Sequence, residues 1–383
     1  MSAGPTGKEV QVVGAGPAGL AAAIQLRRLG LAVEVREKRP NVGMRHEGFQ
    51  GLENWSHDRD ATQVLHQLGI AEEFLLRPVH EIHYYGPSRR PFPVRSPDPI
   101  FYLVKRGPDP SSLDSALLKQ AREAGAVVSF NDPVSTAPAG TIVATGPAMA
   151  HAIAAGVVFR TNLRDIAACI LDPEVAPGAY AYLLAHEGVA TLATMLTRDF
   201  AHAHSYLRRA IESFKRLFDF SMSDEREFGG AGNMDITAPV EKGGHLRVGE
   251  CAGAQDPLWG FGLWFAMETG NLAANCLVEE RSYTAAYRKA ILPRIRRLIV
   301  SRWLFDRLPP GRYDDLLSQL TRLRDVRPAF RKYYTGGPLH TLLFPLARRH
   351  YSFQLREKWC HMDDCDCVWC RHGKQDAVPV ATE

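Results

Sequence analysis

The sequence has little that would point to a membrane-spanning or a disulfide-bonded protein. No stretch of its 383 residues approaches the roughly 18 uninterrupted apolar residues that a bilayer-spanning helix needs. The apolar segment 10–26 is interrupted by Gln11 and by several glycines, which disfavours a secretory signal peptide. Seven cysteines, an odd number, favour a reduced chain over a disulfide framework. We expect a cytoplasmic protein without a transmembrane helix.

The composition also lacks the bias that marks fibrous or disordered chains. Hydrophobic residues make up 45%, charged residues 23% and aromatic residues 9% of the sequence, as in ordinary globular proteins. Disorder, a collagen-like repeat and a long coiled coil are therefore disfavoured. At roughly 100 to 200 residues per domain, the chain is long enough for two or three packed units.

A glycine-rich turn near the N-terminus predicts a dinucleotide-binding unit. Residues 8–13 have the pattern of a short buried strand, and 18–29 that of a helix ending at Gly30. The turn between them contains Gly14, Gly16, Pro17, Ala18 and Gly19. Its first glycine allows a tight bend, its second lets the backbone approach a pyrophosphate, and its third lets the helix pack on the strand. A second strand, 32–36, ends at Glu37, whose carboxylate would hold a ribose hydroxyl pair.

The residues after this second strand resemble those of the glutathione-reductase-like flavoproteins. Glu37 is followed by Lys38 and Arg39, as in the flavin-binding version of the motif. The resemblance implies FAD in preference to NAD. A glycine-rich loop that binds nothing is the alternative. It is disfavoured because strand, turn, helix, strand and acidic residue follow in order within the first 37 residues.

A second strand-to-helix segment carries a basic residue at the end of its strand. Residues 102–126 have the pattern of a strand, then Arg106, then a helix with Ser111 or Ser112 as its N-cap. The segment resembles the strand-Arg-helix segment of flavin monooxygenases and geranylgeranyl reductases. This resemblance implies that Arg106 lies beside the FAD, and a solvated charge at a strand end is the alternative.

Two later segments resemble the parts that complete the dinucleotide fold in such flavoproteins. A short strand beginning at Thr141 ends at Thr145 and Gly146. The run 246–262, followed by a helix over 263–277, is the most specific stretch in the chain. It contains the further residues that we expect at the cofactor: Gly249, Glu250, Asp256, Gly260, Phe261 and Gly262.

This run resembles the Gly-Asp motif of the geranylgeranyl reductase family, and the similarity to that family spans about residues 1–285. The resemblance implies that an acidic side chain meets the ribitol of FAD. It also implies that a helix N-terminus faces the flavin ring, where it would stabilise negative charge on the reduced ring. Glu250 stands where Asp is usual, and the longer side chain changes the reach to the ribitol.

The chain lacks the Asp-Gly motif that flavin hydroxylases carry near FAD and a nicotinamide donor. After Gly146 the sequence instead favours a helix over 148–155. The identity of the electron donor is therefore left open, and an electron-donor protein is an alternative to a nicotinamide.

Candidate substrate residues lie in two segments. Tyr180 and Tyr182 lie where geranylgeranyl reductases have a Tyr-x-Trp-x-Phe-Pro motif, of which Tyr180 matches and Trp is replaced by Tyr182. The resemblance implies substrate contact by one of these tyrosines, and a plain sheet strand is the alternative. Residues 45–56 are too polar and glycine-rich for a core element and predict a loop.

In related flavoproteins this loop passes the pyrophosphate and the flavin edge, which makes Arg45 a candidate phosphate contact. His46 is a candidate proton donor to the substrate, because histidine titrates near neutral pH. A surface histidine in a loop is the alternative.

Most of the basic charge lies in residues 284–358, which hold 17 Lys and Arg against 5 Asp and Glu. Their pattern is helical, with breaks at Pro293 and Pro309, and it resembles the helical C-terminal cap of reductases acting on isoprenoids. Such a charge run is either a solvated face or a site for an anionic headgroup or a membrane surface. No nucleic-acid recognition motif accompanies it.

These observations predict an α/β protein with a Rossmann-like FAD-binding domain, an inserted α+β substrate domain and a helical C-terminal cap. The expected division is FAD-binding parts 1–77, 101–165 and 241–283, substrate-domain parts 78–100 and 166–240, the basic cap 284–358 and a Cys-rich tail 359–383.

The family resemblance implies an FAD-dependent oxidoreductase that reduces carbon-carbon double bonds in an apolar, isoprenoid-like small molecule. Reduced flavin would deliver a hydride and a nearby acid the proton, although no residue stands out as that acid. A flavin-dependent monooxygenase or halogenase is the alternative in the same chemistry. A monooxygenase is disfavoured because the chain lacks the Asp-Gly motif. A halogenase lacks support because the chain has no Trp-x-Trp-x-x-Pro motif. A non-catalytic flavoprotein that docks on a partner is the alternative of another class.

Four cysteines in the tail predict a metal site in polar surroundings. They are Cys360, Cys365, Cys367 and Cys370. Their compact spacing, C-x4-C-x-C-x2-C, leaves an iron-sulfur cluster, zinc and a free thiol tail open.

We expect the anaerobically purified protein to contain bound metal at this cluster. Metal and acid-labile sulfide assays separate the alternatives. Iron with sulfide would indicate a cluster able to pass electrons to the flavin, and zinc alone a structural site. Cysteines that alkylate readily in a metal-free protein would contradict the prediction.

Overall fold

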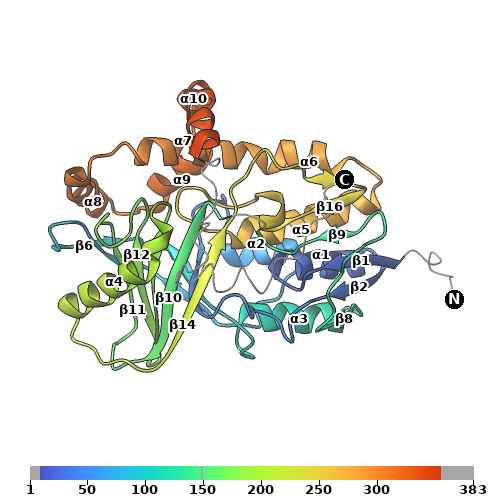
Figure 1. Ribbon diagram of the computed structural model, residues 1–383, viewed down its shortest axis with the longest axis horizontal. Helices are drawn as coiled ribbons and strands as arrows, with labels where there is room; N and C mark the ends of the chain where they lie inside the picture. Colours follow the sequence, from blue (N-terminus) through green and yellow to red (C-terminus); the bar gives the residue numbers. More distant parts are fainter. Residues whose placement is uncertain (1–8, 148–149, 355–383) are drawn as a thin grey trace.

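The computed structural model describes residues 9–147 and 150–354 and arranges them as three sheets with helices packed around them (Figure 1). The first sheet has six strands in the order β15 (Glu241–Lys242), β16 (His245–Arg247), β9 (Ile142–Val143), β1 (Glu9–Val13), β2 (Ala32–Arg36) and β8 (Val127–Ser129). From β16 to β8 the neighbouring strands are parallel. This is the arrangement expected for a dinucleotide-binding α/β fold.

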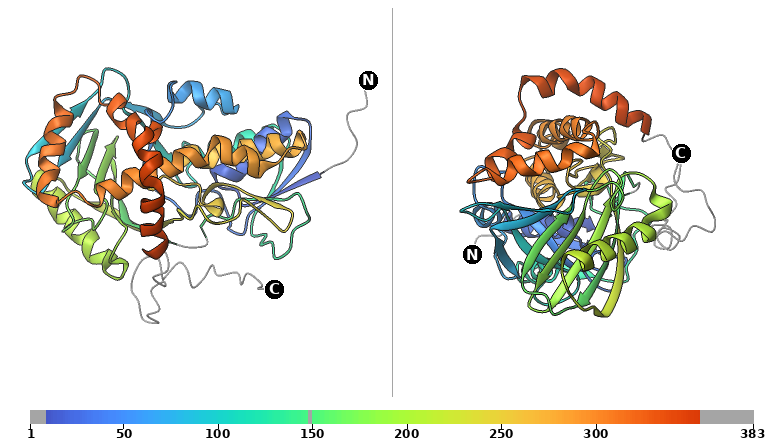
Figure 2. Two further views of the ribbon diagram at one scale, coloured as in Figure 1. Left: turned by 90° about the horizontal axis from the view of Figure 1, so that it is seen from above. Right: turned by 90° about the vertical axis from the view of Figure 1, so that its left-hand side faces the viewer.

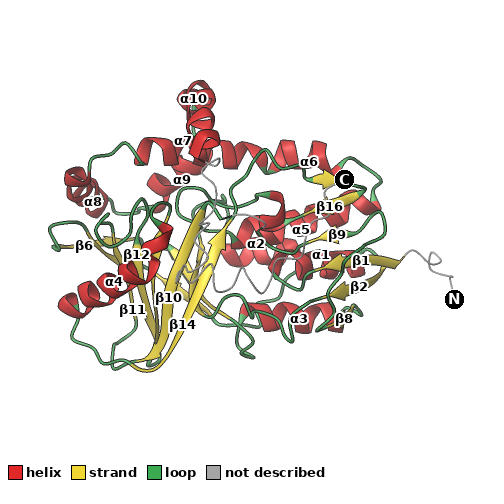
Figure 3. Ribbon diagram, in the orientation of Figure 1, coloured by secondary structure: helices red, strands yellow, loops and turns green. Residues whose placement is uncertain are grey.

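Three helices accompany this sheet: α1 (Pro17–Arg28), α3 (Leu113–Glu123) and α5 (Leu263–Val278). Helix α1 packs against both of the others (Figure 3). A Cβ on Gly19 would collide with the carbonyl oxygen of Gly14, and a Cβ on Gly270 with that of Ala18. Glycine at these two positions therefore permits the close approach of α1 to its turn and to α5.

The second sheet has seven strands in the order β14 (Ser223–Gly232), β10 (Ala152–Arg160), β13 (Val189–Leu196), β12 (Ala181–His186), β11 (Ile166–Ile170), β5 (Glu81–Tyr85) and β6 (Pro91–Arg95). Glu187 and Gly188 form the turn between β12 and β13, and both have positive φ, as a two-residue hairpin loop with a type I′ turn requires. Helix α4 (Ala203–Leu217), which follows the short 3-10 helix η1 (Phe200–His202), packs on β13 and β10 and buries Leu207 and Phe214.

The third sheet has the strand order β3 (Gly48–Glu53), β7 (Phe101–Arg106) and β4 (Leu76–Val79), all antiparallel. Helix α2 (Ala61–Leu68) follows β3, and the Asp60 side chain caps it by accepting a hydrogen bond from the Thr62 N–H. Asp60 also accepts from the Tyr102 hydroxyl at 3.0 Å, which ties the helix start to β7.

Two of the predicted elements are wrong. Residues 48–53 form strand β3, not a loop, because every residue from Gly48 to Glu53 is opposite a residue of β7 and the side chains of Phe49 and Leu52 are buried. The predicted helix over 148–155 is contradicted by β10, which begins at Ala152 between β13 and β14. In both cases pairing with strands remote in the sequence outweighs local composition.

Strand β10 also places residues 152–160 in the seven-stranded sheet, not in the dinucleotide sheet. The sequence-based division assigned them to the FAD-binding unit. The division into domains otherwise stays a prediction.

The last described part of the chain forms helices, as predicted (Figure 2). They are α6 (Tyr283–Ala290), α7 (Leu292–Phe305), α8 (Tyr313–Thr321), α9 (Arg327–Thr335) and α10 (Pro338–Gln354), with the 3-10 turn η3 (Pro310–Arg312) before α8. Helix α7 contacts α6, α9 and α10. Among the helices of the described ranges, none combines the length and the apolar content that crossing a bilayer requires.

A largely buried cluster of charges joins this cap to the dinucleotide domain, with each side chain 17 to 19% exposed. Glu268 of α5 pairs with Arg294 of α7 and accepts a hydrogen bond from His57 at 2.5 Å. The guanidinium of Arg294 also lies over the ring of Phe265, 4.7 Å from its centre. Burial by itself would raise the pKa of Glu268, but the Arg294 charge and the His57 hydrogen bond lower it to about 2.

Glu268→Gln should lower the free energy of unfolding at pH 7 by about 3 kcal/mol, because it leaves the Arg294 charge without its partner. The folded pKa lies below the unfolded value, so this stability is present above pH ~4.5 and is lost as the pH falls toward 2. Urea denaturation at several pH values measures the difference from the wild type.

The matched control is Glu279→Gln at the end of the same helix, where the ion pair with Arg281 is about half exposed. It should cost no more than about 1 kcal/mol. Equal effects of the two substitutions would contradict the stabilising role of the ion pair between Glu268 and Arg294.

Candidate active site

A large cavity brings together residues from all three sheets and from the cap. Its volume is about 1570 Å³, whereas small-molecule pockets usually measure roughly 300 to 1,000 Å³. One end lies where β1 and β2 end, at the carboxyl edge of the six-stranded sheet, and the other end lies under α8 and α9. The cavity has room for a dinucleotide and a second, elongated molecule.

The glycine-rich turn forms the first end of the cavity. Gly14, Gly16, Pro17 and Ala18 line the wall, and Gly19 packs behind it. A Cβ on Gly14 or Gly19 would meet backbone atoms, but a Cβ on Gly16 would meet no protein atom within 4 Å. Gly16 therefore leaves open space in front of the N-terminus of α1, as the close approach of a pyrophosphate requires.

Glu37 lies beside this turn, at the end of β2. Its carboxylate accepts hydrogen bonds from the backbone N–H of Ala15 at 2.8 Å and of Arg39 at 3.0 Å. Lys38 follows it on the cavity wall. The two backbone bonds fix the carboxylate where a ribose bound at the turn would present its hydroxyls.

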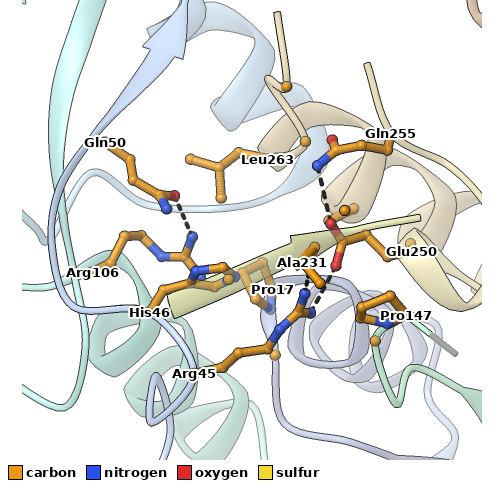
Figure 4. A pocket seen from close by; sticks show the side chains of 18 of the residues that line it. Pro17, Arg45, His46, Gln50, Arg106, Pro147, Ala231, Glu250, Gln255 and Leu263 are labelled. Carbon is orange, nitrogen blue, oxygen red and sulfur yellow. Dashed lines mark hydrogen bonds and ion pairs between the residues drawn. The ribbon is translucent and has the colours of Figure 1, made fainter. Parts of the chain in front are cut away.

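Arg45 and Glu250, predicted as contacts of the phosphate and of the ribitol, point toward each other in the wall (Figure 4). Their ion pair measures 2.7 Å between Nη1 and Oε2. Arg45 also donates to the carbonyl oxygen of Ala231, and Gln255 donates to the other oxygen of Glu250 at 3.0 Å. A phosphate or ribitol bound here would therefore meet a charged pair that is already neutralised.

Arg106 is a buried residue of the wall, so the alternative of a solvated strand-end charge is wrong. Its side chain is 5% exposed and pairs with both oxygens of Asp114, at 2.8 and 3.0 Å. It also donates to Gln50 at 2.7 Å (Figure 4). Asp114 additionally accepts from the Gly107 N–H at 3.0 Å, which fixes the end of β7 against the start of α3.

His46 lies in the same part of the wall, and its imidazole faces Gly230 of β14. The side chain is half-buried on this wall. Burial lowers the pKa of His46 well below its usual value, and the charges of Arg45, Arg106 and Arg39 lower it further. The lowered pKa favours the neutral imidazole, and the role of His46 as a proton donor stays a prediction.

Residues of the two later predicted segments, 141–146 and 246–262, also line the cavity. Thr145 and Gly146 follow β9, Gly249 begins the 3-10 turn η2 (Gly249–Ala252), and Gly260, Phe261 and Gly262 lead into α5. The N-terminus of α5 thus opens on the cavity, and Leu263, its first residue, lies on the wall. This is the arrangement that would stabilise negative charge on a bound ring system.

Asp256 does not line the cavity, in contrast to the prediction. It is fully buried and accepts hydrogen bonds from the N–H groups of Leu258 at 2.7 Å and Trp259 at 3.3 Å. The hydroxyl of Tyr334, from α9, donates to it at 2.6 Å. Burial raises the pKa of Asp256 to about 6 although these hydrogen bonds lower it. Its role is to hold the loop that leads into α5.

The other end of the cavity is apolar and aromatic. Tyr180 and Tyr182 both lie on its wall, as expected, in or beside strand β12. The Tyr180 hydroxyl donates to the carbonyl oxygen of Trp259 at 2.6 Å. Burial raises the pKa values of both tyrosines well above normal, so they stay protonated. Tyr182 is also a residue of the seven-stranded sheet, and substrate contact by either tyrosine stays a prediction.

Several wall residues were not predicted. They are Trp55, Tyr84, Cys169, Trp259, Leu316, Leu320, Phe330 and Tyr333. They come from six separate segments, and no sequence motif connects them. Trp55 and Trp259 lie in segments that the sequence analysis singled out, 45–56 and 246–262. For the others the sequence carried no signal, because an apolar side chain facing this cavity has the same local pattern as one facing the core.

The predicted metal ligands Cys360, Cys365, Cys367 and Cys370 lie outside the described residues. Within 9–147 and 150–354, no group of three or more His, Cys, Asp or Glu side chains is arranged to hold a metal ion. The iron-sulfur and zinc assignments therefore stay predictions.

The chain is similar to known proteins both in its N-terminal part and over most of its length. Residues 12–73 match the family model of the NAD(P)-binding Rossmann-like domain. Digeranylgeranylglycerophospholipid reductase 2 of Methanothermobacter thermautotrophicus is 27% identical over 371 residues, covering 82% of this chain and 91% of that protein. The corresponding reductase of Thermoplasma volcanium is 24% identical over 355 residues, covering 77% of this chain and 86% of that protein.

Solved structures with the same fold include a geranylgeranyl bacteriochlorophyll reductase-like protein from Thermoplasma acidophilum. Its TM-score is 0.67 at 20% identity, covering 91% of this chain and 98% of that chain. The flavin-dependent brominase Bmp2 has a TM-score of 0.62 at 16% identity, covering 91% and 100%. The comparisons confirm the Rossmann-like fold of the FAD-dependent oxidoreductases and the resemblance of this chain to the geranylgeranyl reductase family.

Proposed function

We propose that this protein is an FAD-dependent reductase of carbon-carbon double bonds in an isoprenoid chain. The observation that carries the proposal is the single cavity that joins a dinucleotide-binding turn to an apolar, aromatic-lined end. The relatives named as digeranylgeranylglycerophospholipid reductases support the isoprenoid class of the substrate.

The residues of the polar end fit FAD. Gly16 leaves space for the diphosphate, and Glu37 is fixed beside it for the adenosine ribose. We propose that Arg45 and Glu250 contact the phosphate and ribitol portions, and that Arg106 holds the wall beside the ring. Bound FAD would supply the hydride in its reduced form.

The apolar end would bind the isoprenoid chain and exclude water from it. Tyr180 and Tyr182 remain proposed substrate contacts, with Trp55, Phe330 and Tyr333 on the same wall. Because the Tyr180 hydroxyl is directed at the Trp259 carbonyl, it positions the residue before Gly260 in the loop that leads into α5. The proton donor and the electron donor are not assigned. An electron-donor protein stays an alternative to a nicotinamide, and a metal cluster at the C-terminal cysteines would pass its electrons to the flavin.

Gly16→Val should abolish FAD binding without unfolding the protein. Gly16 has extended backbone angles that valine adopts, and the space in front of it contains no protein atom. The flavin absorbance of the purified variant and its dissociation constant for FAD measure the effect, and thermal unfolding of the FAD-free protein measures stability. We expect at least a hundredfold weaker binding with little loss of stability.

Gly311→Val is the matched control, since Gly311 also has open space around it but lies in η3, away from the cavity. It should bind FAD normally. Full FAD occupancy in Gly16→Val would refute the assignment of the cofactor site.

Anaerobically reduced, FAD-loaded protein should add two hydrogens to each double bond that it reduces in a geranylgeranyl substrate. Mass spectrometry of the extracted product measures the gain. Oxygen consumption coupled to hydroxylation or halogenation of a substrate would instead indicate the monooxygenase or halogenase alternative. Flavin that cycles between its redox states without product from any isoprenoid would favour a non-catalytic flavoprotein.

A further inference from the structure

One face of the seven-stranded sheet forms a wall of the apolar end of the cavity. The strand register aligns Tyr84 of β5, Cys169 of β11 and Tyr182 of β12, because Cys169 is paired with both tyrosines. Residues paired in this way have their side chains on the same face of a sheet, and all three line the cavity. They form a row across three strands, in which a small side chain separates two large ones.

The β12 end of this row is fixed against the loop that leads into α5. The Tyr180 hydroxyl donates to the carbonyl oxygen of Trp259 at 2.6 Å, and the ring centres of Tyr180 and Tyr182 lie 6.3 Å apart. From β12 the sheet continues through β11 to β5. The backbone of Tyr84 is therefore two strand spacings, about 10 Å, from that of Tyr182. The row leads from the start of α5 toward the edge of the sheet.

Helix α8 covers the far end of the row. It contacts β5 and β6, the last two strands at this edge of the sheet (Figure 1). A Cβ on Gly86, just after β5, would collide with the carboxylate of Asp314 in the first turn of α8, so the helix and the strand end pack closely. Leu316 and Leu320 are one helical turn apart and both line the cavity.

This part of the cavity offers no partner to a charged group. Among the described residues of β5, β11, β12, α8 and α9 that line the cavity, none is Lys, Arg, His, Asp or Glu. A phosphate or another charged headgroup would lose its hydration there without compensation. A molecule that extends along the row toward α8 therefore enters with a hydrocarbon tail, and its headgroup stays outside this part.

We propose that the space between the row and α8 binds the tail of the isoprenoid, and that Cys169 and Leu320 set how long a chain the protein accepts. The proposal rests on the proposed function, because it takes the reacting double bond to lie beside the start of α5. The small side chain of Cys169 leaves the way between the two tyrosines open, and Leu316 and Leu320 form the wall that a long tail meets. A larger side chain at Cys169 or Leu320 would shorten the space for the tail.

The test measures the binding of three prenyl alcohols that share one headgroup: geraniol, farnesol and geranylgeraniol. Equilibrium dialysis against the full-length, FAD-loaded, oxidised protein gives their dissociation constants without turnover. In the wild type each added isoprene unit should tighten binding roughly tenfold or more, because it buries further apolar surface.

The two substitutions should shorten the accepted chain to different lengths. Leu320→Trp should raise the ratio of the geranylgeraniol to the geraniol dissociation constant roughly tenfold or more, since only the longer tail reaches α8. Cys169→Phe fills the row nearer to the start of α5, so it should raise the ratio of the farnesol to the geraniol constant by a similar factor as well. A general loss of stability would not produce this order.

Leu323→Trp is the matched control, since Leu323 is 39% exposed, lies two residues beyond the end of α8 and does not line the cavity. It should bind the three alcohols like the wild type. FAD content and thermal unfolding check the fold of each variant, and Leu316→Phe tests the same wall if Leu320→Trp is unstable. Unchanged ratios in the Cys169 and Leu320 variants would overturn the proposal, as would wild-type protein that binds all three alcohols equally.

Turnover separates this proposal from the proposed function. Binding with the expected dependence on chain length, without reduction of any isoprenoid, would refute the proposed function and leave the tail site standing. Reduction of isoprenoids by variants whose binding ratios equal those of the wild type would support the proposed function and overturn the tail site.

Discussion

The carboxylate of Asp256 joins two parts of the molecule. It accepts hydrogen bonds from the backbone of the loop that leads into α5, and the Tyr334 hydroxyl of the cap donates to it at 2.6 Å. Both residues are at most 1% exposed. Because a buried acceptor that loses a partner costs free energy, the loop cannot move without the cap. The position of Gly260 to Gly262 in the cavity wall depends on this contact.

The cavity divides chemically along its length because different constraints shape its two ends. At the dinucleotide end, backbone groups and a few fixed charges form the wall: Glu37 is held by two N–H groups, and Arg106 by the two oxygens of Asp114. At the other end, aromatic and aliphatic side chains form the wall. A charged group is stabilised at the first end and a hydrocarbon chain at the second, so a bound molecule of each type has a defined place.

The arginines of the cap have two different physical roles. Arg294 and Arg302 point inward and are paired with largely buried carboxylates, where removal of one partner would leave an uncompensated charge. Arg296 and Arg348 point outward and are exposed. The high positive charge of this segment is therefore not a single property: part of it holds the fold together, and part of it shapes the surface.

The sequence by itself determined the elements whose interactions are local. The Gly14 to Gly19 turn, the strands on either side of α1 and the acidic residue at Glu37 could be predicted, because each depends on neighbours within a few residues. The same holds for the start of α5 at Leu263 and for the N-cap Ser112, whose side chain accepts from the Ser115 N–H. Local backbone preference and side-chain periodicity are sufficient for such elements.

Only the tertiary structure decided the parts that depend on distant partners. Strand β3 forms because it pairs with β7, although the local sequence favoured a loop. Strand β10 forms because it pairs with β13 and β14, although the local sequence favoured a helix. Asp256 accepts hydrogen bonds from the backbone of its own loop and from Tyr334. Arg45 forms an ion pair with Glu250. Strand pairing, burial and ion pairs join residues far apart in the chain, and a linear pattern does not record which of them meet.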